Sequence, residues 1–381
     1  MAYFDNASTT FPKPEIVYSE MDRFYRSNGA SIGRGGYKKA VSAYQMIADT
    51  RKRIQRLLKC PAKQVVFTPT ATIALNIILQ GLMTNEKQTV YITPLEHNAV
   101  TRTLHFLMQA GKINIKKLEL DSNLRYDMPA IENQFKKCHP DILIMSHASN
   151  VCGLIAPVEE LSIMGKRYGA TVIIDMAQTA GLVSCNTGLE TIDFAVFAGH
   201  KTMYGPTGVS GFVMNPSVQL KPVIFGGTGF ESANQDMPTA IPERFEMGTL
   251  NSVGIAGLNA ALRWIDEIGI EKIREVEKKN RKKLIEILSR YEFIHIVGEK
   301  QGNEYVGVVS VLIDDISSDS CASVFDRLGI SVRTGLQCAP LAHMFLGTYP
   351  AGTVRFSVGY FTSHKDYVEL EQALDYIAEN I

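Results

Sequence analysis

Short apolar segments alternate with helical patterns along most of the chain, and this alternation narrows the folds that the chain can adopt. Helical patterns at residues 39–58, 71–82 and 98–109 lie among segments that we predict to be strands, at residues 65–67, 89–92, 141–146, 171–175, 193–198 and 209–214. Strands that alternate with helices are typical of a mostly parallel sheet with helices on both faces. The sequence therefore predicts an α/β fold.

The pattern changes after residue 249. A long helical stretch is predicted at residues 252–290, and its dense run of charges at residues 271–283 is typical of a solvated helix face. A strand, a helix, a strand and a helix follow at residues 306–313, 320–328, 354–358 and 365–377. We interpret these elements as a separate small α+β unit, and a chain of 381 residues is long enough for two domains.

Composition excludes several classes of partner. Lys plus Arg and Asp plus Glu both number 39, so the formal net charge is zero, which argues against nucleic acid or an anionic membrane surface. No apolar run is long enough to span a bilayer, and the start of the chain does not resemble a leader. The six cysteines form no CxxC pair and no metal-ligand spacing, so we expect no metal site and a cytoplasmic chain with reduced thiols.

The tripeptide Gly199-His200-Lys201 closes the apolar segment at residues 193–198 and precedes a glycine-rich turn. Desolvation at such a strand end lowers the pKa of a lysine and makes its amine a better nucleophile. One use of that amine is a Schiff base with pyridoxal phosphate (PLP), a cofactor that proteins hold with a lysine and with a carboxylate at the pyridine nitrogen. The alternative is a lysine that extends its ammonium group from a strand end into solvent.

Asp175 supplies a candidate for that carboxylate. It ends the β-branched segment at residues 171–175, and ligands of open α/β sheets bind beyond the carboxyl ends of the strands. Gln178, three residues later, could reach the hydroxyl group of the cofactor ring. The alternative role of Asp175 is to cap the following helix.

Together these residues resemble the class V aminotransferase family of PLP enzymes. Asp175-Met-Ala-Gln178 followed by Phe197-Ala-Gly-His-Lys201 is most similar to the cysteine desulfurases, and within them to the second group, which is selenocysteine lyase-like and passes sulfur to a separate acceptor protein. Further matching segments occur in the family's order, at residues 3–10, 67–76, 96–97, 149–153, 244–249, 333–338 and 354–357. The resemblance extends from Tyr3 to the last predicted helix.

The resemblance implies the PLP-dependent transferase fold type I. In that fold a large domain with a mostly parallel seven-stranded sheet, flanked by helices, is joined to a smaller α+β C-terminal domain. We expect the large PLP-binding domain at residues 15–250, and the small domain at residues 1–14 and 251–381. The resemblance also implies a homodimer, in which Thr249 reaches the cofactor phosphate of the neighbouring subunit.

The same resemblance assigns the other cofactor contacts. The phosphate is expected at Ala71, Thr72 and His200, where a helix N-terminus favours an anion. His97 is expected to stack on the cofactor ring and exchange protons, and Asn150 to lie near the ring hydroxyl and the substrate. Local structural roles are the alternatives: Thr72 as a helix cap, Asn150 as a turn residue and His97 as a structural histidine.

Three positions depart from the family's pattern. Ala71 stands where a threonine is usual and Ala198 where a serine is usual, so two hydroxyl donors to the phosphate are lost. Tyr37, after Arg34-Gly35, stands where the second group usually has a histidine, so we expect a different substrate pocket. We expect weaker cofactor binding unless backbone groups or water compensate.

Arg355 and Cys338 are the predicted substrate-directed residues. Arg355 lies in the predicted strand at residues 354–358, and a guanidinium binds a carboxylate bidentately, as the α-carboxylate of an amino acid requires; a structural ion pair is the alternative. Cys338 lies in a short loop predicted between strands, where a flexible and partly exposed thiol is available as a nucleophile. Buried apolar positions fit Cys138, Cys185 and Cys321 better, and the role of Cys152, which lies inside an active-site loop, is left open.

The sequence thus predicts a PLP-dependent cysteine desulfurase. It would convert L-cysteine to L-alanine, with Lys201 removing the α-proton and Cys338 taking the sulfur as a persulfide, for transfer to an acceptor protein in sulfur metabolism and iron–sulfur cluster assembly. Two alternatives stay open. A selenocysteine lyase, a cysteine-sulfinate lyase or another class V aminotransferase-type enzyme would need no nucleophilic thiol. A non-catalytic protein of the same fold would not need Lys201 and Asp175.

Overall fold

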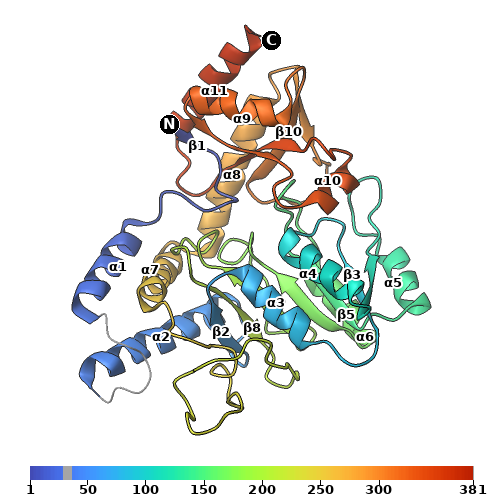
Figure 1. The fold of residues 1–381 in the computed structure, drawn as a ribbon. Coiled ribbons are helices and arrows are strands. Elements are labelled where there is room, and N and C mark those ends of the chain that lie inside the picture. Colours follow the sequence, from blue (N-terminus) through green and yellow to red (C-terminus); the bar gives the residue numbers. More distant parts are fainter. Residues whose placement is uncertain (29–36, 381) are drawn as a thin grey trace.

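The computed structural model describes residues 1–28 and 37–380, and its largest element is a seven-stranded sheet (Figure 1). The strand order is β2-β8-β7-β6-β5-β3-β4, and β8 runs antiparallel to both of its neighbours while the other pairs are parallel. The strands are β2 Gln64–Thr68, β3 Gln88–Ile92, β4 Ile113–Lys117, β5 Ile142–Ser146, β6 Thr171–Asp175, β7 Phe194–Ala198 and β8 Ser210–Met214. This sheet confirms the predicted α/β class.

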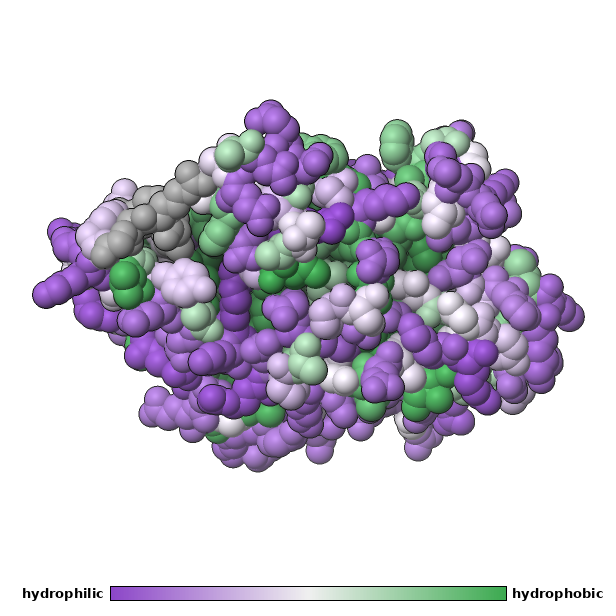
Figure 2. Space-filling model, turned by 90° about the horizontal axis from the view of Figure 1, so that it is seen from below, coloured by the Kyte–Doolittle hydropathy of each residue, from purple (hydrophilic) through white to green (hydrophobic). Residues whose placement is uncertain are grey.

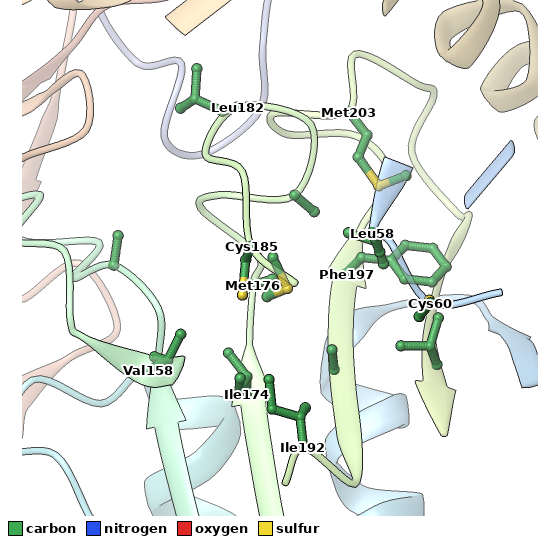
Figure 3. Packing of buried hydrophobic residues seen from close by; sticks show 14 of the residues in the cluster. Leu58, Cys60, Val158, Ile174, Met176, Leu182, Cys185, Ile192, Phe197 and Met203 are labelled. Carbon is green, nitrogen blue, oxygen red and sulfur yellow. The ribbon is translucent and has the colours of Figure 1, made fainter. Parts of the chain in front are cut away.

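Helices cover both faces of the sheet, which is why every residue of β5, β7 and β8 is buried. Successive residues alternate between the two cores: Phe194 and Val196 join one cluster, whereas Ala195 and Phe197 join the other. Figure 3 shows part of the second cluster, in which Phe197 packs near residues from the neighbouring strand and loops. The first core is closed by α3 Ala71–Gly81 and α4 Asn98–Gln109, and the second by α2 Lys38–Leu57, α5 Met128–Lys137, α6 Val158–Arg167 and α7 Ser252–Ile268.

The helical stretch predicted at residues 252–290 is present, but it is divided into two helices. The structure has two helices, α7 Ser252–Ile268 and α8 Ile270–Leu288, which are separated by Gly269. Gly269 has a φ of +86°, a conformation that side chains with a Cβ atom rarely adopt, so the first helix ends there. The edge strand β4 was missed because its exposed residues are polar and give no buried-strand pattern.

A four-stranded antiparallel sheet forms the C-terminal part, with the order β12-β13-β10-β9. Its strands are β9 Ile294–Val297, β10 Val308–Ile313, β12 Arg333–Gly335 and β13 Thr353–Ser357, and the helices beside it are α9 Ser318–Arg327, α10 Pro340–Leu346 and α11 His364–Ala378. The beginning of the chain lies here too, because β1 Ala2–Tyr3 pairs with β11 Ile330–Ser331 (Figure 1). A small α+β unit is therefore present.

The division into domains at residues 14/15 and 250/251 stays a prediction. Helix α7 follows the expected boundary, yet it packs against α1 Glu15–Asn28 and α2, and its Leu258 and Leu262 belong to the core of the large sheet. Residues 1–14 and the C-terminal sheet share a separate core, to which Phe4 contributes.

Hydrophilic residues cover most of the face shown in Figure 2, and hydrophobic residues form small groups among them. Among the described residues, no helix combines the length and the apolar character that crossing a membrane requires. Tyr37 is exposed and immediately precedes α2, whereas Arg34 and Gly35, which carried the resemblance at this position, lie outside the described residues.

Candidate functional site

A pocket of about 230 Å³ lies at the carboxyl ends of the parallel strands, where open α/β sheets bind their ligands. Ser146, Asp175 and Ala198 end the strands β5, β6 and β7, and the first residues of α3 and α4 complete the wall. The pocket brings together eight of the predicted site residues, which are Ala71, Thr72, His97, Asn150, Asp175, Gln178, His200 and Lys201. Their roles stay predictions, but their convergence follows from the sheet topology.

Lys201 and Asp175 are the lysine and the carboxylate among the described residues that line this pocket. Burial lowers the pKa of Lys201 to about 8, against the opposing attraction of Asp175. Burial also raises the pKa of Asp175, while a hydrogen bond of 2.9 Å from the Ala177 amide to its Oδ1 and the charge of Lys201 act in the other direction. Turns rather than a helix follow β6, so the alternative role of Asp175 as a helix cap is wrong, and its Oδ1 accepts within a turn while the residue lines the pocket. A substantial share of the Lys201 amine is neutral near pH 8.

His97 caps the N-terminus of α4. Its Nδ1 accepts a hydrogen bond of 3.0 Å from the Ala99 amide, so the neutral ring carries its proton on Nε2. Burial and the nearby cations Lys201 and Arg355 lower the pKa of His97 to about 4. The ring is therefore neutral at ordinary pH and lines the pocket with a fixed tautomer.

The expected phosphate end of the pocket is formed by the start of α3 and by His200. Thr70 is the helix cap here, since its side chain accepts a hydrogen bond of 3.2 Å from the Ile73 amide, and Thr72 is exposed. The Nδ1 atom of His200 is buried and has no hydrogen-bond partner within residues 1–28 and 37–380. A buried ring nitrogen without a partner costs free energy unless a ligand satisfies it.

Thr249 does not belong to this pocket in its own subunit. It is exposed and lines a neighbouring pocket together with Phe67, Gly208 and Asn251. The segment before it is held firmly, because Glu246 forms an ion pair of 2.7 Å with Arg51. An assignment of Thr249 to the cofactor of the same subunit is therefore not supported by its position.

Arg355 is buried in the middle of β13. Its guanidinium already has a carboxylate partner within the chain, Asp5. Its Nη2 lies 2.9 Å from Asp5 Oδ1 and donates to Ser8 Oγ at 2.9 Å. Its Nη1 donates to the carbonyl of Asn150 at 3.0 Å. Its Nε is buried without a partner among the residues that the structure describes, so this edge of the guanidinium keeps a free donor.

Cys338 is the exposed cysteine of the six, and it lies close enough to Lys201 and Arg355 to interact electrostatically with both. Two details of the prediction are corrected. The loop connects β12 to the short helix α10 rather than two strands, and its backbone is fixed, since the Asn98 amide donates to the Cys338 carbonyl at 2.7 Å. Cys152 is buried, and burial raises the pKa of its thiol, so it suits a structural position.

The sequence analysis did not single out Ser146, and it placed Glu96 and Asp5 in matching segments without giving either a role. Ser146 lies opposite Asp175 in the pairing of β5 with β6, and its position at a predicted strand end was a usable signal. Glu96 is fully buried and accepts from both the amide and the hydroxyl of Ser146 at 2.7 Å, and burial raises its pKa to about 7. Asp5 had no such signal, because it contacts a residue 350 positions away in the chain.

Comparisons with known proteins agree with this fold and site. The family model Aminotransferase class-V matches residues 2–370, so the chain belongs to the aminotransferase class-V family. It is 29% identical over 382 residues to a probable cysteine desulfurase of Methanothermobacter thermautotrophicus, covering 99% of this chain and 94% of the relative. It is 31% identical over 344 residues to a probable cysteine desulfurase of Pyrococcus abyssi, covering 88% of this chain and 84% of the relative.

Solved structures share the whole architecture. The apo structure of cysteine desulfurase from Thermococcus onnurineus NA1 superimposes with a TM-score of 0.91 at 28% identity, covering all of this chain and 95% of that chain. This similarity confirms the predicted fold type, with its large mostly parallel sheet and its smaller C-terminal part.

Proposed function

We propose that this chain is a PLP-dependent cysteine desulfurase that converts L-cysteine to L-alanine and takes the sulfur onto Cys338. The observation that carries the proposal is the placement of an exposed thiol beside a pocket that holds Lys201 and Asp175. A lysine and a carboxylate are the groups with which proteins hold PLP, and the relatives and solved structures named cysteine desulfurase support the reaction.

The residues of the pocket fit the cofactor. The unpartnered Nδ1 of buried His200 and the amides at the start of α3 suit a phosphate group, and the Lys201 amine suits a covalent bond to an aldehyde. The Asp175 carboxylate would hold a proton on the ring nitrogen, with Gln178 and Asn150 as further polar contacts. When bound, PLP supplies an electrophilic aldehyde and a ring that accepts electrons.

The side chains around the cofactor would then move protons. Lys201, once its amine is free, is placed to take the α-proton of the substrate, and its lowered pKa of about 8 keeps part of that amine neutral. His97 is neutral with its proton on Nε2, so it can offer that N–H group to the substrate as a hydrogen-bond donor. Both groups act from fixed positions at the ends of β7 and the start of α4.

Arg355 and Cys338 would handle the two ends of L-cysteine. The free Nε donor of Arg355 suits the α-carboxylate, while Asp5 and Ser8 hold the guanidinium in place. The Cys338 thiolate attacks the substrate sulfur, so that an S–S bond forms as the Cβ–S bond breaks. The β-carbon takes a proton, alanine leaves, and the enzyme keeps the sulfur as a persulfide. An added thiol, or a sulfur-acceptor protein, would accept that sulfur and regenerate Cys338.

The test is to incubate the PLP-loaded protein with L-cysteine and excess dithiothreitol, and to measure alanine and sulfide together. We expect equal amounts of both products, because one Cβ–S cleavage yields one of each. Alanine without sulfide, pyruvate in place of alanine, or no product at all would contradict the proposed reaction.

We also propose a homodimer that completes each cofactor site across the interface, and a cytoplasmic role in sulfur transfer such as iron–sulfur cluster assembly. Thr249 supports the first proposal, because it is exposed and lies outside the pocket of its own subunit. Exposed aromatic residues supply apolar surface, among them Tyr25 at 69%, Tyr44 at 55% and Phe225 at 70% exposure. The proposed cytoplasmic location rests on the six cysteines, which are all free, because reduced thiols are typical of that compartment.

The shared site predicts the behaviour of mixed dimers. Thr249→Ala should weaken PLP retention while the subunit stays folded, since a hydrogen bond to a charged acceptor contributes about 1.5–3 kcal/mol. A heterodimer of Thr249→Ala and Lys201→Ala subunits places both defects in one site and leaves the other site intact. Activity assays of purified mixed dimers should therefore recover about half of the wild-type activity. A mixture as inactive as Lys201→Ala alone, or an active monomer in sedimentation, would contradict the shared site.

A further inference from the structure

The loop that carries Cys338 has a backbone conformation that needs support from its surroundings. Gln337 and Cys338 have φ values of +40° and +57°, in the left-handed region that residues other than glycine seldom adopt. Such a residue costs free energy and persists only where neighbouring contacts hold it. The Cys338 thiol itself is free and exposed.

The support comes from the side chain of Gln337, which is 5% exposed. Its Nε2 donates to the carbonyl of Thr353 at 2.9 Å, and its Oε1 accepts from His343 Nε2 at 2.7 Å. On the other side of the ring, His343 Nδ1 accepts from Thr348 Oγ1 at 2.7 Å. Because Gln337 Nε2 must donate, its Oε1 must accept, and His343 is fixed as the tautomer with its proton on Nε2.

Two backbone contacts hold the same loop from the side of the pocket. The Asn150 side chain donates to the Gln337 carbonyl at 2.8 Å, and the Asn98 amide at the start of α4 donates to the Cys338 carbonyl at 2.7 Å. In Figure 1, α10 lies above α4, which agrees with these contacts. The backbone of the loop is therefore fixed on both sides, while the thiol of Cys338 is left free to react.

The same contacts join the loop to Arg355. Thr353 and Arg355 are two residues apart on β13, so their side chains lie on the same face of the strand. A second route passes through Asn150, whose side chain binds Gln337 and whose carbonyl accepts from Arg355. Gln337 is therefore connected to Arg355, the residue that suits the substrate carboxylate, by two routes. One passes through Thr353 on β13, and the other passes through Asn150.

We propose that Gln337, held by His343, is a positioning residue that sets the place of the Cys338 thiol relative to a substrate bound at Arg355. This inference rests on the proposed desulfurase reaction. Attack on sulfur needs the thiol in line with the bond that breaks, and a misplacement of about 1 Å can lower the rate about 10²-fold. Asp5 and Ser8, which lie outside this loop, also hold Arg355, so we expect substrate binding and proton transfer at Lys201 to change less than the attack on sulfur.

The test compares Gln337→Leu with the wild-type holoenzyme on two substrates. For L-cysteine, kcat should fall about 10- to 100-fold while KM changes less than about threefold. Turnover of L-selenocysteine, whose selenium can leave without thiol attack, should change less than about twofold. Gln301→Leu, at an exposed turn position, is the matched control and should leave both substrates unchanged.

A second measurement, hydrogen exchange, follows the stability of the loop independently of enzyme activity. Hydrogen exchange of the peptide at residues 333–346 should speed up in Gln337→Leu and in Gln337→Asn, whose shorter side chain cannot make both contacts. Unchanged exchange together with an unchanged kcat for L-cysteine would overturn the proposal, and so would an equal loss for both substrates. If the wild type forms no alanine from L-cysteine, the desulfurase reaction fails, while the exchange result still decides whether Gln337 holds the loop.

Discussion

In Lys201→Ala, turnover of L-cysteine should fall by at least about 10³-fold, because the change removes both the proposed covalent tether of the cofactor and the proposed base for the α-proton. Lys201 lines the pocket beside Asp175, and the described pocket residues include no second lysine that could replace it. Alanine formation and the visible absorbance of the purified protein are the measurements. We expect the variant to lose most of its bound PLP on gel filtration.

A stability measurement separates this loss from unfolding. The pKa of Lys201 is lowered from 10.5 to about 8, so the fold disfavours its ammonium form. That penalty is fully present below pH 8 and disappears as the pH rises through 10.5, since the amine is then neutral in both the folded and the unfolded state. The free energy of unfolding of the apo wild type should therefore rise relative to Lys201→Ala between pH 8 and 10.5. Lys221→Ala, at an exposed position, is the control and should keep full activity.

Much of the fold could be predicted because the buried parallel strands have no polar face. The segments at β5, β6 and β7 are continuous apolar runs bounded by turns, and their ends agree with the structure to within one residue. Such apolar runs are by themselves enough to indicate a sheet that is covered by helices on both faces. The end of α7 at Gly269 was harder to predict, because a single glycine is compatible with a continuous helix. Only the packing of α7 and α8 decides whether the helix is interrupted there.

The site was predictable where its residues follow strand ends, and it was not where residues distant in the sequence meet. Asp175 ends β6 and Lys201 follows β7, so topology alone brings them to one pocket. The contacts of Arg355 with Asp5 and of Gln337 with Thr353 join different elements, and neither local periodicity nor spacing carries that information. The family resemblance supplied the candidate Arg355 but not the carboxylate that holds it.

Cys338→Ser should keep the binding of L-cysteine and lose its desulfurisation. A serine hydroxyl is far less nucleophilic than a thiolate toward sulfur, so alanine and sulfide formation should fall by at least about 10²-fold while the spectral change on adding L-cysteine persists. Cys338 is exposed at the edge of the pocket and within electrostatic range of Lys201, which makes it the cysteine best placed for the attack.

L-Selenocysteine gives the second arm of this test, because selenium can leave without thiol attack, and its turnover by Cys338→Ser should stay within a few-fold of the wild type. Cys152→Ser is the matched control: that thiol is buried, burial raises its pKa, and the variant should desulfurise L-cysteine normally. If Cys152→Ser is inactive while Cys338→Ser releases sulfide at the wild-type rate, the nucleophile is Cys152. If both variants lose L-cysteine and L-selenocysteine turnover alike, the two thiols support the pocket rather than the transfer of sulfur, and the persulfide mechanism is wrong.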